Sequence, residues 1–528
     1  MVEGVDMWTS FIRIIAVLDC WEEGALSARW SPTILFGFGY PILNYYAPLF
    51  SYFSAGLSWI LKNPVIGLNL SLGIIFFLSG VMMFIFSSRS WGKIAGFFSA
   101  VFYLYAPFHL LEIYNRGACA EFSVYFFLPL IFWLVSEDIF QPSLRKFLLA
   151  AVAIAGLILT HNLMGLTGLI LLVGYILFIL YSSKKWSLPF FIRIAALFAT
   201  SLALSACFWL PVIMEKNLVS LDLLIRNGFE YEKHFLNLKT VLLGAFKKQF
   251  FLSKEFELRI ALLFCVSTLL TIRLFLKRKN KSEGLQIFFW SISGLLIVYI
   301  ITNASSWLWG KIPPLAFFQF PWRFLVISNF ISAFLAGALI FLIQNKKNRI
   351  LVCTLLSLVI MNIFWKGTIP YHGWRDIKIT DRKEWLFQQT PADSREYLPK
   401  WVKGFLPVIP HSRIQSIKGT AEIFPKYFIP KFKNSFRVIS SSGSVICFYH
   451  YYFPGWEVLI DKTPTEIFTD NPGGFIIFFV PPGNHNVTVQ FTSTLPRKIG
   501  NTISLLTALA VILLFIGQSI LKTRKRNN

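Results

Sequence analysis

Residues 68–88 read LNLSLGIIFFLSGVMMFIFSS and carry no charged side chain. A helix of this length crosses the hydrocarbon layer of a bilayer, which is about 30 Å thick. Similar apolar runs recur along the chain and predict about eleven spans, at residues 68–88, 92–111, 122–138, 144–160, 163–181, 188–211, 257–276, 285–302, 324–344, 350–366 and 499–521. We therefore predict an all-α polytopic membrane protein.

The composition of the whole chain agrees with this class. Of its 528 residues, 55% are hydrophobic and 14% are charged, whereas soluble proteins carry about a quarter charged residues. Aromatic residues are abundant, with 56 Phe, 17 Trp and 18 Tyr, which is typical of helices anchored at lipid interfaces. The six cysteines are scattered without CxxC spacing, so the sequence indicates neither a disulfide framework nor a zinc site.

The net charge of +24 is concentrated beside the apolar runs. Basic clusters next to spans are typical of cytoplasmic loops rather than of a nucleic-acid-binding patch, so no nucleic-acid partner is expected. Such clusters occur at Lys184-Lys185, Lys277-Arg278-Lys279, Lys346-Lys347 and Arg524-Lys525-Arg526. Placing them inside predicts a multi-pass protein of the inner (plasma) membrane, with a cytoplasmic C-terminus and with residues 367–498 outside.

The same span count puts residues 1–67 on the outer side. Residues 43–61 are apolar, but a span there would move the basic loops to the wrong side. We therefore expect an aromatic-rich helix lying in the membrane interface. A first span that precedes Met1 and is missing from this sequence is the simplest account of an outer start. The alternative is a protein whose N-terminus lies outside as written.

Residues 367–498 are predicted to form an extracytoplasmic domain, α/β at first and then rich in strands. Alternating stretches such as Phe436-Arg-Val-Ile and Gly474-Phe-Ile-Ile-Phe-Phe-Val are separated by turns such as Pro481-Pro-Gly483. We expect a small β-sandwich with Trp456 in its core. The predicted organisation is an outer segment at 1–67, a helical domain at 68–366, the outer domain at 367–498, and a C-terminal helix with a basic tail at 499–528.

The first outer segment contains carboxylates, arginines and a Gly/Pro-rich turn. Asp6 and Arg13 are followed by Arg29 and by Gly37-Phe-Gly-Tyr-Pro41. An acceptor hydroxyl needs a carboxylate to take its proton, and a phosphate leaving group needs cationic stabilisation. This segment offers both, although a solvated loop without a function has the same composition.

Several strings resemble a known family. The N-terminal segment, with Arg29-Trp-Ser-Pro32, Gly37-Phe-Gly-Tyr-Pro41 and Tyr45-Tyr-Ala-Pro-Leu49, is similar to the first outer loop of bacterial "6-pyruvoyl-tetrahydropterin synthase-related" membrane proteins. Tyr114-Asn-Arg-Gly-Ala-Cys-Ala-Glu121 and Gln319-Phe-Pro-Trp-Arg-Phe324 match the same family. Tyr452-Phe-Pro-Gly-Trp456 is similar to the outer domain of YfhO-like membrane proteins. Both families resemble the GT-C glycosyltransferase superfamily, whose members use a polyprenyl-phosphate sugar at the outer membrane face.

This resemblance implies roles for charged residues. In GT-C enzymes the catalytic carboxylate lies early in the first outer loop, the place that Asp6 has here. The family pattern usually has a histidine four residues later, where this chain has Ser10. Glu121 would assist Asp6 or bind a divalent cation; no other cofactor is implied.

Further polar residues complete the candidate site. The substrate-binding candidates are Arg13, Arg29, Arg116, Arg323 and Glu215. Simpler explanations exist for some of them, because Arg116 can neutralise Glu121, and Arg323 can reach lipid headgroups. His161, in a turn between two spans, fits a turn residue better than a ligand.

The leading hypothesis is an inverting glycosyltransferase. It would take a sugar from polyprenyl phosphate and pass it to a glycan, lipid or protein acceptor, with Asp6 as the base and with Arg116 and Arg323 holding the phosphate. The alternative is a non-catalytic protein that binds or moves lipid-linked glycans or envelope polymers in the same groove. Secondary transport is disfavoured, because few ionisable residues lie in the middle of spans.

Overall fold

The computed structural model describes residues 4, 6–221, 230–236, 281–365, 397–403, 412–425 and 431–527. The predicted span at 257–276 and most of the N-terminal part of the predicted outer domain lie outside these residues.

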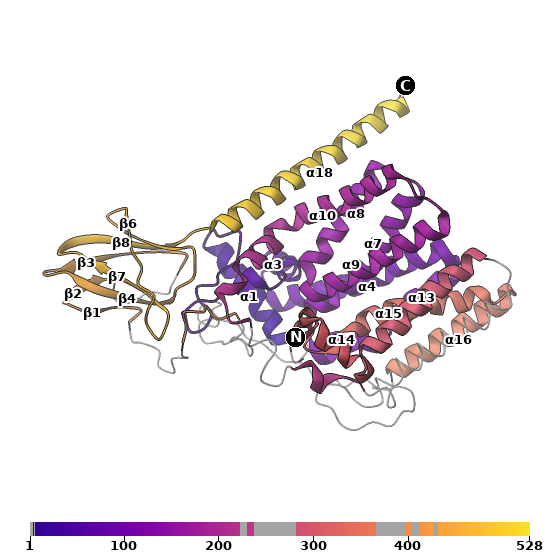
Figure 1. The fold of residues 1–528 in the computed structure, drawn as a ribbon, viewed down its shortest axis with the longest axis horizontal. Helices are drawn as coiled ribbons and strands as arrows, with labels where there is room; N and C mark the ends of the chain where they lie inside the picture. Colours follow the sequence, from indigo (N-terminus) through magenta and orange to yellow (C-terminus); the bar gives the residue numbers. More distant parts are fainter. Residues whose placement is uncertain are drawn as a thin grey trace.

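A bundle of long helices makes up most of the molecule (Figure 1). Its principal helices are α1 (Met7–Glu22), α3 (Leu49–Leu61), α4 (Pro64–Trp91), α5 (Lys93–Leu104), α7 (Cys119–Phe140), α8 (Leu144–Thr160), α9 (Asn162–Ser183), α10 (Leu188–Glu215), α13 (Lys281–Ile300), α15 (Leu325–Leu342), α16 (Lys346–Trp365) and α18 (Leu495–Asn527). Short segments connect them, namely α2 (Ile42–Tyr45), α6 (Pro107–Leu111), the π-helix η1 (Glu112–Arg116), and the 3-10 or single-turn elements η2 (Lys216–Leu218), η4 (Tyr231–His234), η5 (Asn303–Ser305), α14 (Ser306–Lys311), η6 (Pro313–Phe318) and η7 (Pro321–Phe324).

The predicted class of a polytopic helical membrane protein is confirmed. Each predicted apolar segment within the described residues coincides with a helix or, for 92–111, with the bent pair formed by α5 and the segment that follows it. Among the described residues, 7 helices are long and apolar enough to cross a membrane, or up to 8 if the bent pair counts as one span. Helix α8 has 17 residues and is shorter than that criterion.

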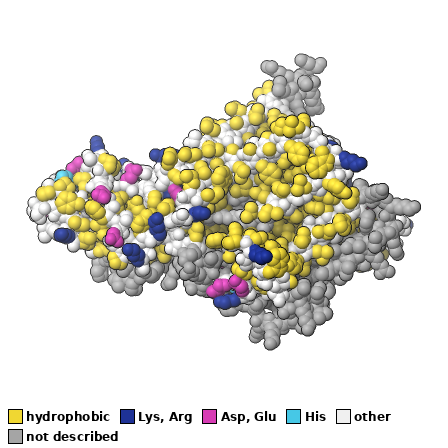
Figure 2. Space-filling view, in the orientation of Figure 1, with side chains coloured by type: hydrophobic (Ala, Val, Ile, Leu, Met, Phe, Trp, Pro, Cys, Tyr) yellow, Lys and Arg dark blue, Asp and Glu magenta, His cyan; other side chains and the backbone are white. Residues whose placement is uncertain are grey.

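The surface of the bundle has the polarity that lipid contact requires. Figure 2 shows hydrophobic side chains covering the visible face of the bundle, whereas Lys, Arg, Asp and Glu are scattered over the small domain beside it. Exposed apolar residues such as Leu177, Phe288 and Leu513 are 50%, 56% and 69% accessible. Such a continuous apolar surface is expected of helices that face hydrocarbon rather than water.

The N-terminal segment differs from its expected loop. Residues 7–22 form the helix α1, and Phe11, Ile12 and Ile15 on it are completely buried. The apolar run between Arg13 and Asp19 explains this helix, because its burial against α3 and α4 outweighs the few polar residues. The expected aromatic helix at 43–61 is present as α2 and α3.

The C-terminal domain is a small antiparallel β-sandwich, as expected. One sheet has the strand order β1-β4-β7 and the other β2-β3-β8-β5-β6. The strands are β1 (Ile414–Lys418), β2 (Ala421–Phe424), β3 (Lys433–Ser440), β4 (Ser444–Tyr451), β5 (Trp456–Ile460), β6 (Thr463–Thr465), β7 (Phe475–Val480) and β8 (Gly483–Phe491). Side chains of β3 alternate between exposed and buried, and Trp456 is 4% exposed, so its predicted core position is confirmed.

Buried hydrogen bonds connect this sandwich to the segment between α1 and α2. Trp30, which is completely buried, donates its indole N–H to His450 Nε2 at 3.0 Å, and His450 Nδ1 lies 2.9 Å from the Gly37 carbonyl. Burial lowers the pKa of His450 to about 3, which keeps the ring neutral between these two partners. The Gly37-Phe-Gly-Tyr-Pro41 string is therefore a docking segment for the sandwich.

Three basic side chains lie together at one end of the bundle. Arg89 and Lys146 pair with Glu137 at 3.2 and 3.1 Å, and Arg193 pairs with Asp138 at 2.6 Å. These acids lie near the C-terminal end of α7, whose N-terminal end lies about 30 Å away at 1.5 Å per residue. The sandwich adjoins the other end, near α1 and α3 (Figure 1). Which end faces the cytoplasm stays a prediction.

Candidate functional site

A polar cavity of about 390 Å³ lies near the N-terminal end of α7, at the opposite end of that helix from Glu137 and Asp138. Its wall is formed by the starts of α1, α7 and η7, the α8–α9 turn, the end of α10 and the region around α2. Five of the seven predicted site residues line it, namely Asp6, Arg13, Arg116, Glu121 and Arg323. The fold thus brings together residues that are more than 300 positions apart in the sequence.

Helix α1 presents one polar face to this cavity. Asp6, Thr9, Ser10 and Arg13 all line it. They follow the spacing i, i+3, i+4, i+7, which places side chains on a single face of a helix. The other faces of α1 carry its buried apolar residues, so packing of those faces fixes where Asp6 and Arg13 point.

A glycine lets the start of α1 approach the second polar segment. The Asp6 backbone N–H donates to the Arg116 carbonyl at 2.5 Å. Gly117 has a φ of +68°, and a Cβ at this position would lie 2.5 Å from Met7 Cβ. A side chain at Gly117 would therefore push α1 away, and the close approach leaves Asp6 Oδ2 3.9 Å from an Arg116 nitrogen.

Behind Asp6 lies a buried cluster of two acids and two bases. Arg116 pairs with Glu112 one turn earlier and with Glu121 at 3.1 Å. Arg323 Nε lies 3.5 Å from the same Glu121 oxygen, and Arg323 also donates to the Phe318 carbonyl at 3.0 Å. The side chains of Glu112 and Glu121 are 0% and 2% exposed. These charges neutralise one another, and the cluster supports the cavity wall.

Arg13 is the exception among the arginines of the cavity. It is 9% exposed, and its guanidinium carbon lies 3.6 Å from the centre of the Tyr46 ring. Within the described part of the chain no carboxylate lies within ion-pair distance of it, and its Nε has no hydrogen-bond partner. A buried cation without a counterion is costly, so an anion entering the cavity gains most from Arg13.

Asp6 is the accessible carboxylate of the cavity. Its side chain is 40% exposed, against 2% for Glu121. A hydroxyl entering from solvent therefore reaches Asp6 first, whereas Glu121 is held between Arg116 and Arg323.

Two predicted site residues lie elsewhere. Glu215 accepts hydrogen bonds from Asn44 at 2.8 Å and from Arg497 at 3.0 Å, beneath the start of α18. Arg29 donates to the Cys207 carbonyl and, at 2.8 Å, to Asn501. Neither lines the cavity. Their contacts join α10 to α18 and to the N-terminal segment, and a direct contact of either residue with substrate stays an untested prediction that this geometry does not favour.

The described side chains of the cavity do not fit the divalent cation that Glu121 was expected to bind. Among the described residues, no group of three or more His, Cys, Asp or Glu side chains could hold a metal ion. Glu121 lies between two guanidinium groups, which repel a cation.

Several residues of the cavity, and one residue of the buried cluster beside it, were not anticipated from the sequence. Glu112 belongs to none of the sequence motifs described above, although its i, i+4 spacing to Arg116 is a signal for a helical ion pair. Trp322 stacks its ring 4.5 Å from the Arg116 guanidinium, and Tyr397 stacks on Tyr45 with ring centres 5.8 Å apart. His161, expected to be a turn residue, lies in that turn and also lines the cavity.

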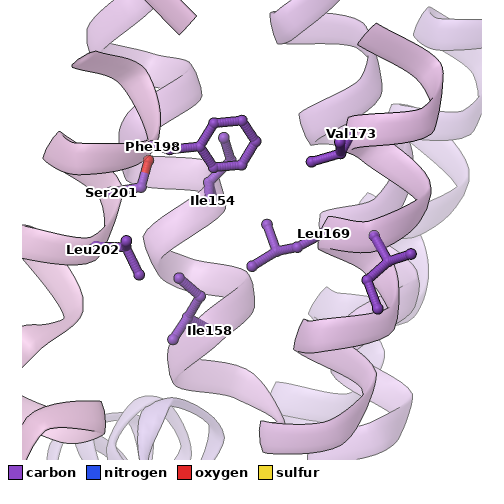
Figure 3. A pocket seen from close by; sticks show the side chains of 8 residues that line it. Ile154, Ile158, Leu169, Val173, Phe198, Ser201 and Leu202 are labelled. Carbon is purple, nitrogen blue, oxygen red and sulfur yellow. The ribbon is translucent and has the colours of Figure 1, made fainter. Parts of the chain in front are cut away.

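A second cavity, of about 330 Å³, is almost entirely apolar (Figure 3). Figure 3 shows side chains of α8, α9 and α10 facing a shared space, among them Ile158, Leu169 and Leu202. Its one hydroxyl, on Ser201, donates to the Leu197 carbonyl at 2.7 Å. The cavity therefore offers apolar contact and no chemistry. On its rim, Ile170 is 64% exposed, as expected of a groove open to lipid.

Comparisons with known proteins give matches at low sequence identity. An uncharacterised protein of Lactococcus lactis subsp. cremoris is 26% identical over 219 residues, which is 40% of this chain and 35% of that protein. Among solved structures, ArnT from Cupriavidus metallidurans in the apo state is similar with a TM-score of 0.40 and 12% identity, over 70% of this chain and 62% of that one. The Archaeoglobus fulgidus oligosaccharyltransferase, in a complex with Zn and sulfate, is similar with a TM-score of 0.37 and 13% identity, over 77% and 56%.

The chain thus spans less than two thirds of the length of each of these proteins. A family model described as a 6-pyruvoyl-tetrahydropterin synthase related domain of membrane proteins matches residues 43–369, which is more than half of the chain. The chain belongs to this 6-pyruvoyl-tetrahydropterin synthase-related family of membrane proteins.

Proposed function

We propose that the protein is a membrane glycosyltransferase that takes a sugar from a polyprenyl phosphate. The observation that carries the proposal is that one cavity holds both an accessible carboxylate, Asp6, and a buried cation, Arg13, which has no ion-pair partner among the described residues. They lie two turns apart on the same helix face, so both reach a single ligand. Proton removal from an acceptor and stabilisation of a phosphate leaving group need this combination.

In the proposed reaction, an acceptor hydroxyl attacks the anomeric carbon of the sugar. The new bond between acceptor oxygen and anomeric carbon forms as the bond between that carbon and the phosphate oxygen breaks. Asp6 takes the hydroxyl proton, and polyprenyl phosphate leaves with the bonding electrons. A single displacement of this kind inverts the anomeric configuration.

The buried acid–base cluster leads us to assign the phosphate contact to Arg13 rather than to Arg116 or Arg323. Both of the latter already pair with Glu121, so a phosphate would have to compete with a buried carboxylate for them. Arg13 offers its charge without such competition. Arg116 and Arg323 then hold Glu121 in place within the neutral cluster of the cavity wall.

The apolar cavity supports a lipid-linked substrate. Leu163 and Val212 line the polar cavity, and Leu169 and Leu202 on the same two helices line the apolar one. At 1.5 Å per residue along a helix, the apolar cavity begins about 9 to 15 Å further into the bundle. An amphiphile with its phosphate at Arg13 therefore finds an apolar groove for the start of its chain.

Transfer by the full-length protein in liposomes tests the proposal. With polyprenyl-phosphate sugars as donors and a mixture of envelope glycans and lipids as acceptors, wild type is expected to release polyprenyl phosphate. Asp6→Asn removes the proton acceptor while keeping the size of the side chain, and loss of a general base costs about 100- to 10,000-fold in rate. Undiminished release by Asp6→Asn would refute the assignment of the base.

The same experiment separates the enzyme from a carrier that binds or moves lipid-linked glycans. A carrier binds the donor, is insensitive to Asp6→Asn and releases no polyprenyl phosphate. Binding without release in wild type, across all donors, would favour the carrier.

A further inference from the structure

The ring of His161 has a fixed hydrogen-bonding state. His161 caps α9, and its Nδ1 accepts the backbone N–H of Met164 at 3.2 Å. An Nδ1 that accepts a hydrogen bond carries no proton, so the neutral ring has its hydrogen on Nε2. The Nε2–H group is a donor, and within the described part of the chain no partner for it is found.

The cavity surrounds this ring with charge. His161 is 9% exposed, lines the cavity, and lies with its ring centre 6.5 Å from that of Tyr46, the residue beneath Arg13. Burial is the main cause that lowers the pKa of His161 to about 4. Arg323, Arg116 and Arg13 lower the pKa further, whereas Glu121 opposes them. At physiological pH the ring is therefore a neutral donor.

We propose that His161 Nε2–H donates a hydrogen bond to a phosphate oxygen of the ligand held by Arg13. This inference rests on the proposed function and assigns one more contact in the same site. Phosphate oxygens are strong acceptors, and a neutral donor among three arginines adds a bond without adding repulsion between cations. Because Nδ1 is occupied by the cap, the ring cannot relay protons, and its role is to position the phosphate.

Replacing His161 by serine keeps the helix cap but removes the hydrogen-bond donor from the cavity. In His161→Ser the hydroxyl still accepts the Met164 N–H, because serine is a strong N-cap residue, but it is too short to reach into the cavity. The melting temperature of the ligand-free protein should stay within a few degrees of wild type. His161→Asn, which also caps a helix, gives a second reading if the serine variant folds poorly.

The experiment measures binding of farnesyl phosphate, a short polyprenyl monophosphate, to the detergent-solubilised full-length protein. We expect His161→Ser to bind about 10- to 100-fold more weakly than wild type, the range for one hydrogen bond to a charged group. The dissociation constant of His161→Ser divided by that of wild type should be constant between pH 5.5 and 8, because the ligand's own titration affects both proteins equally. An imidazolium donor would instead make this ratio fall as the pH rises through about 6.5.

The outcomes separate the two levels of the proposal. If Arg13→Gln weakens binding and His161→Ser does not, the phosphate site stands and the His161 contact is refuted. A ratio that changes with pH refutes the neutral donor. If wild type does not bind farnesyl phosphate at all, the proposed function itself is refuted, and the His161 contact with it.

Discussion

Arg13 gives the sharpest energetic prediction. Because its buried charge has no carboxylate partner among the described residues, Arg13 should destabilise the ligand-free protein and stabilise the complex with a bound anion. In the free protein its charge is compensated within the described residues only by the Tyr46 ring, 3.6 Å from the guanidinium carbon. A desolvated cation–π contact contributes about 2 kcal/mol, less than the several kcal/mol that burying an ion costs. Arg13→Gln should therefore melt no lower than wild type without ligand.

With a phosphate bound, the effect of Arg13 reverses, and its charge becomes stabilising. Two opposite unit charges 4 Å apart attract by about 4 kcal/mol at an effective dielectric of 20, and part of that is lost to desolvation of the phosphate. We expect Arg13→Gln to lose about 2 to 4 kcal/mol of binding free energy, a decrease of about 30- to 1,000-fold in affinity. Isothermal titration with farnesyl phosphate and a thermal melt of the same sample measure both effects.

Arg145→Gln is the matched control. It removes the same charge from another cation–π pair, with Phe515 at 5.3 Å, at the start of α8 and thus at the other end of the bundle. Its affinity for farnesyl phosphate should equal that of wild type. Two results would refute the proposal that Arg13 binds an anion. One is an Arg13→Gln protein that binds farnesyl phosphate as tightly as wild type. The other is an Arg13→Gln protein that melts several degrees lower than wild type while Arg145→Gln does not.

Two further predictions concern the lipid chain and the orientation. Leu169→Trp fills part of the apolar cavity and should weaken binding of a 55-carbon polyprenyl phosphate more than that of a ten-carbon analogue; an equal loss for both would contradict the proposed groove. For orientation, cysteine placed at Lys462 in the sandwich should react with a membrane-impermeant maleimide added to intact cells, whereas cysteine at Lys347 should react only after permeabilisation, and the reverse pattern would overturn the predicted topology.

The fold was largely predictable, because both of its signals are local. Apolar runs such as 68–88 indicate helices through their length and composition alone, and the alternation in Phe436-Arg-Val-Ile indicates a half-buried strand. The helix α1 was not anticipated, because the span count placed residues 1–67 in an outer segment. The one sequence signal for the face of α1 that lines the cavity is the i, i+3, i+4, i+7 spacing of Asp6, Thr9, Ser10 and Arg13.

The sequence suggested the residues of the candidate site and one pair of partners, Arg116 with Glu121, which the structure shows at 3.1 Å; the other partners were not predicted. Asp6, Arg116, Glu121 and Arg323 meet as the strings suggested. Which arginine stays unpaired depends on distances across the bundle, and Arg116 and Arg323 converge on one acid that only the fold brings to both. His161 looked like a turn residue for the same reason, because the cavity beside it is formed by distant segments.

A structure of the full-length protein with a bound polyprenyl phosphate, determined by cryo-electron microscopy, tests the central claim most directly. The account predicts the phosphate in the polar cavity, within hydrogen-bonding distance of Arg13 and on the same side as Asp6, with the first prenyl units running toward Leu169 between α8, α9 and α10. A phosphate bound elsewhere on the bundle, with the polar cavity empty, would contradict it.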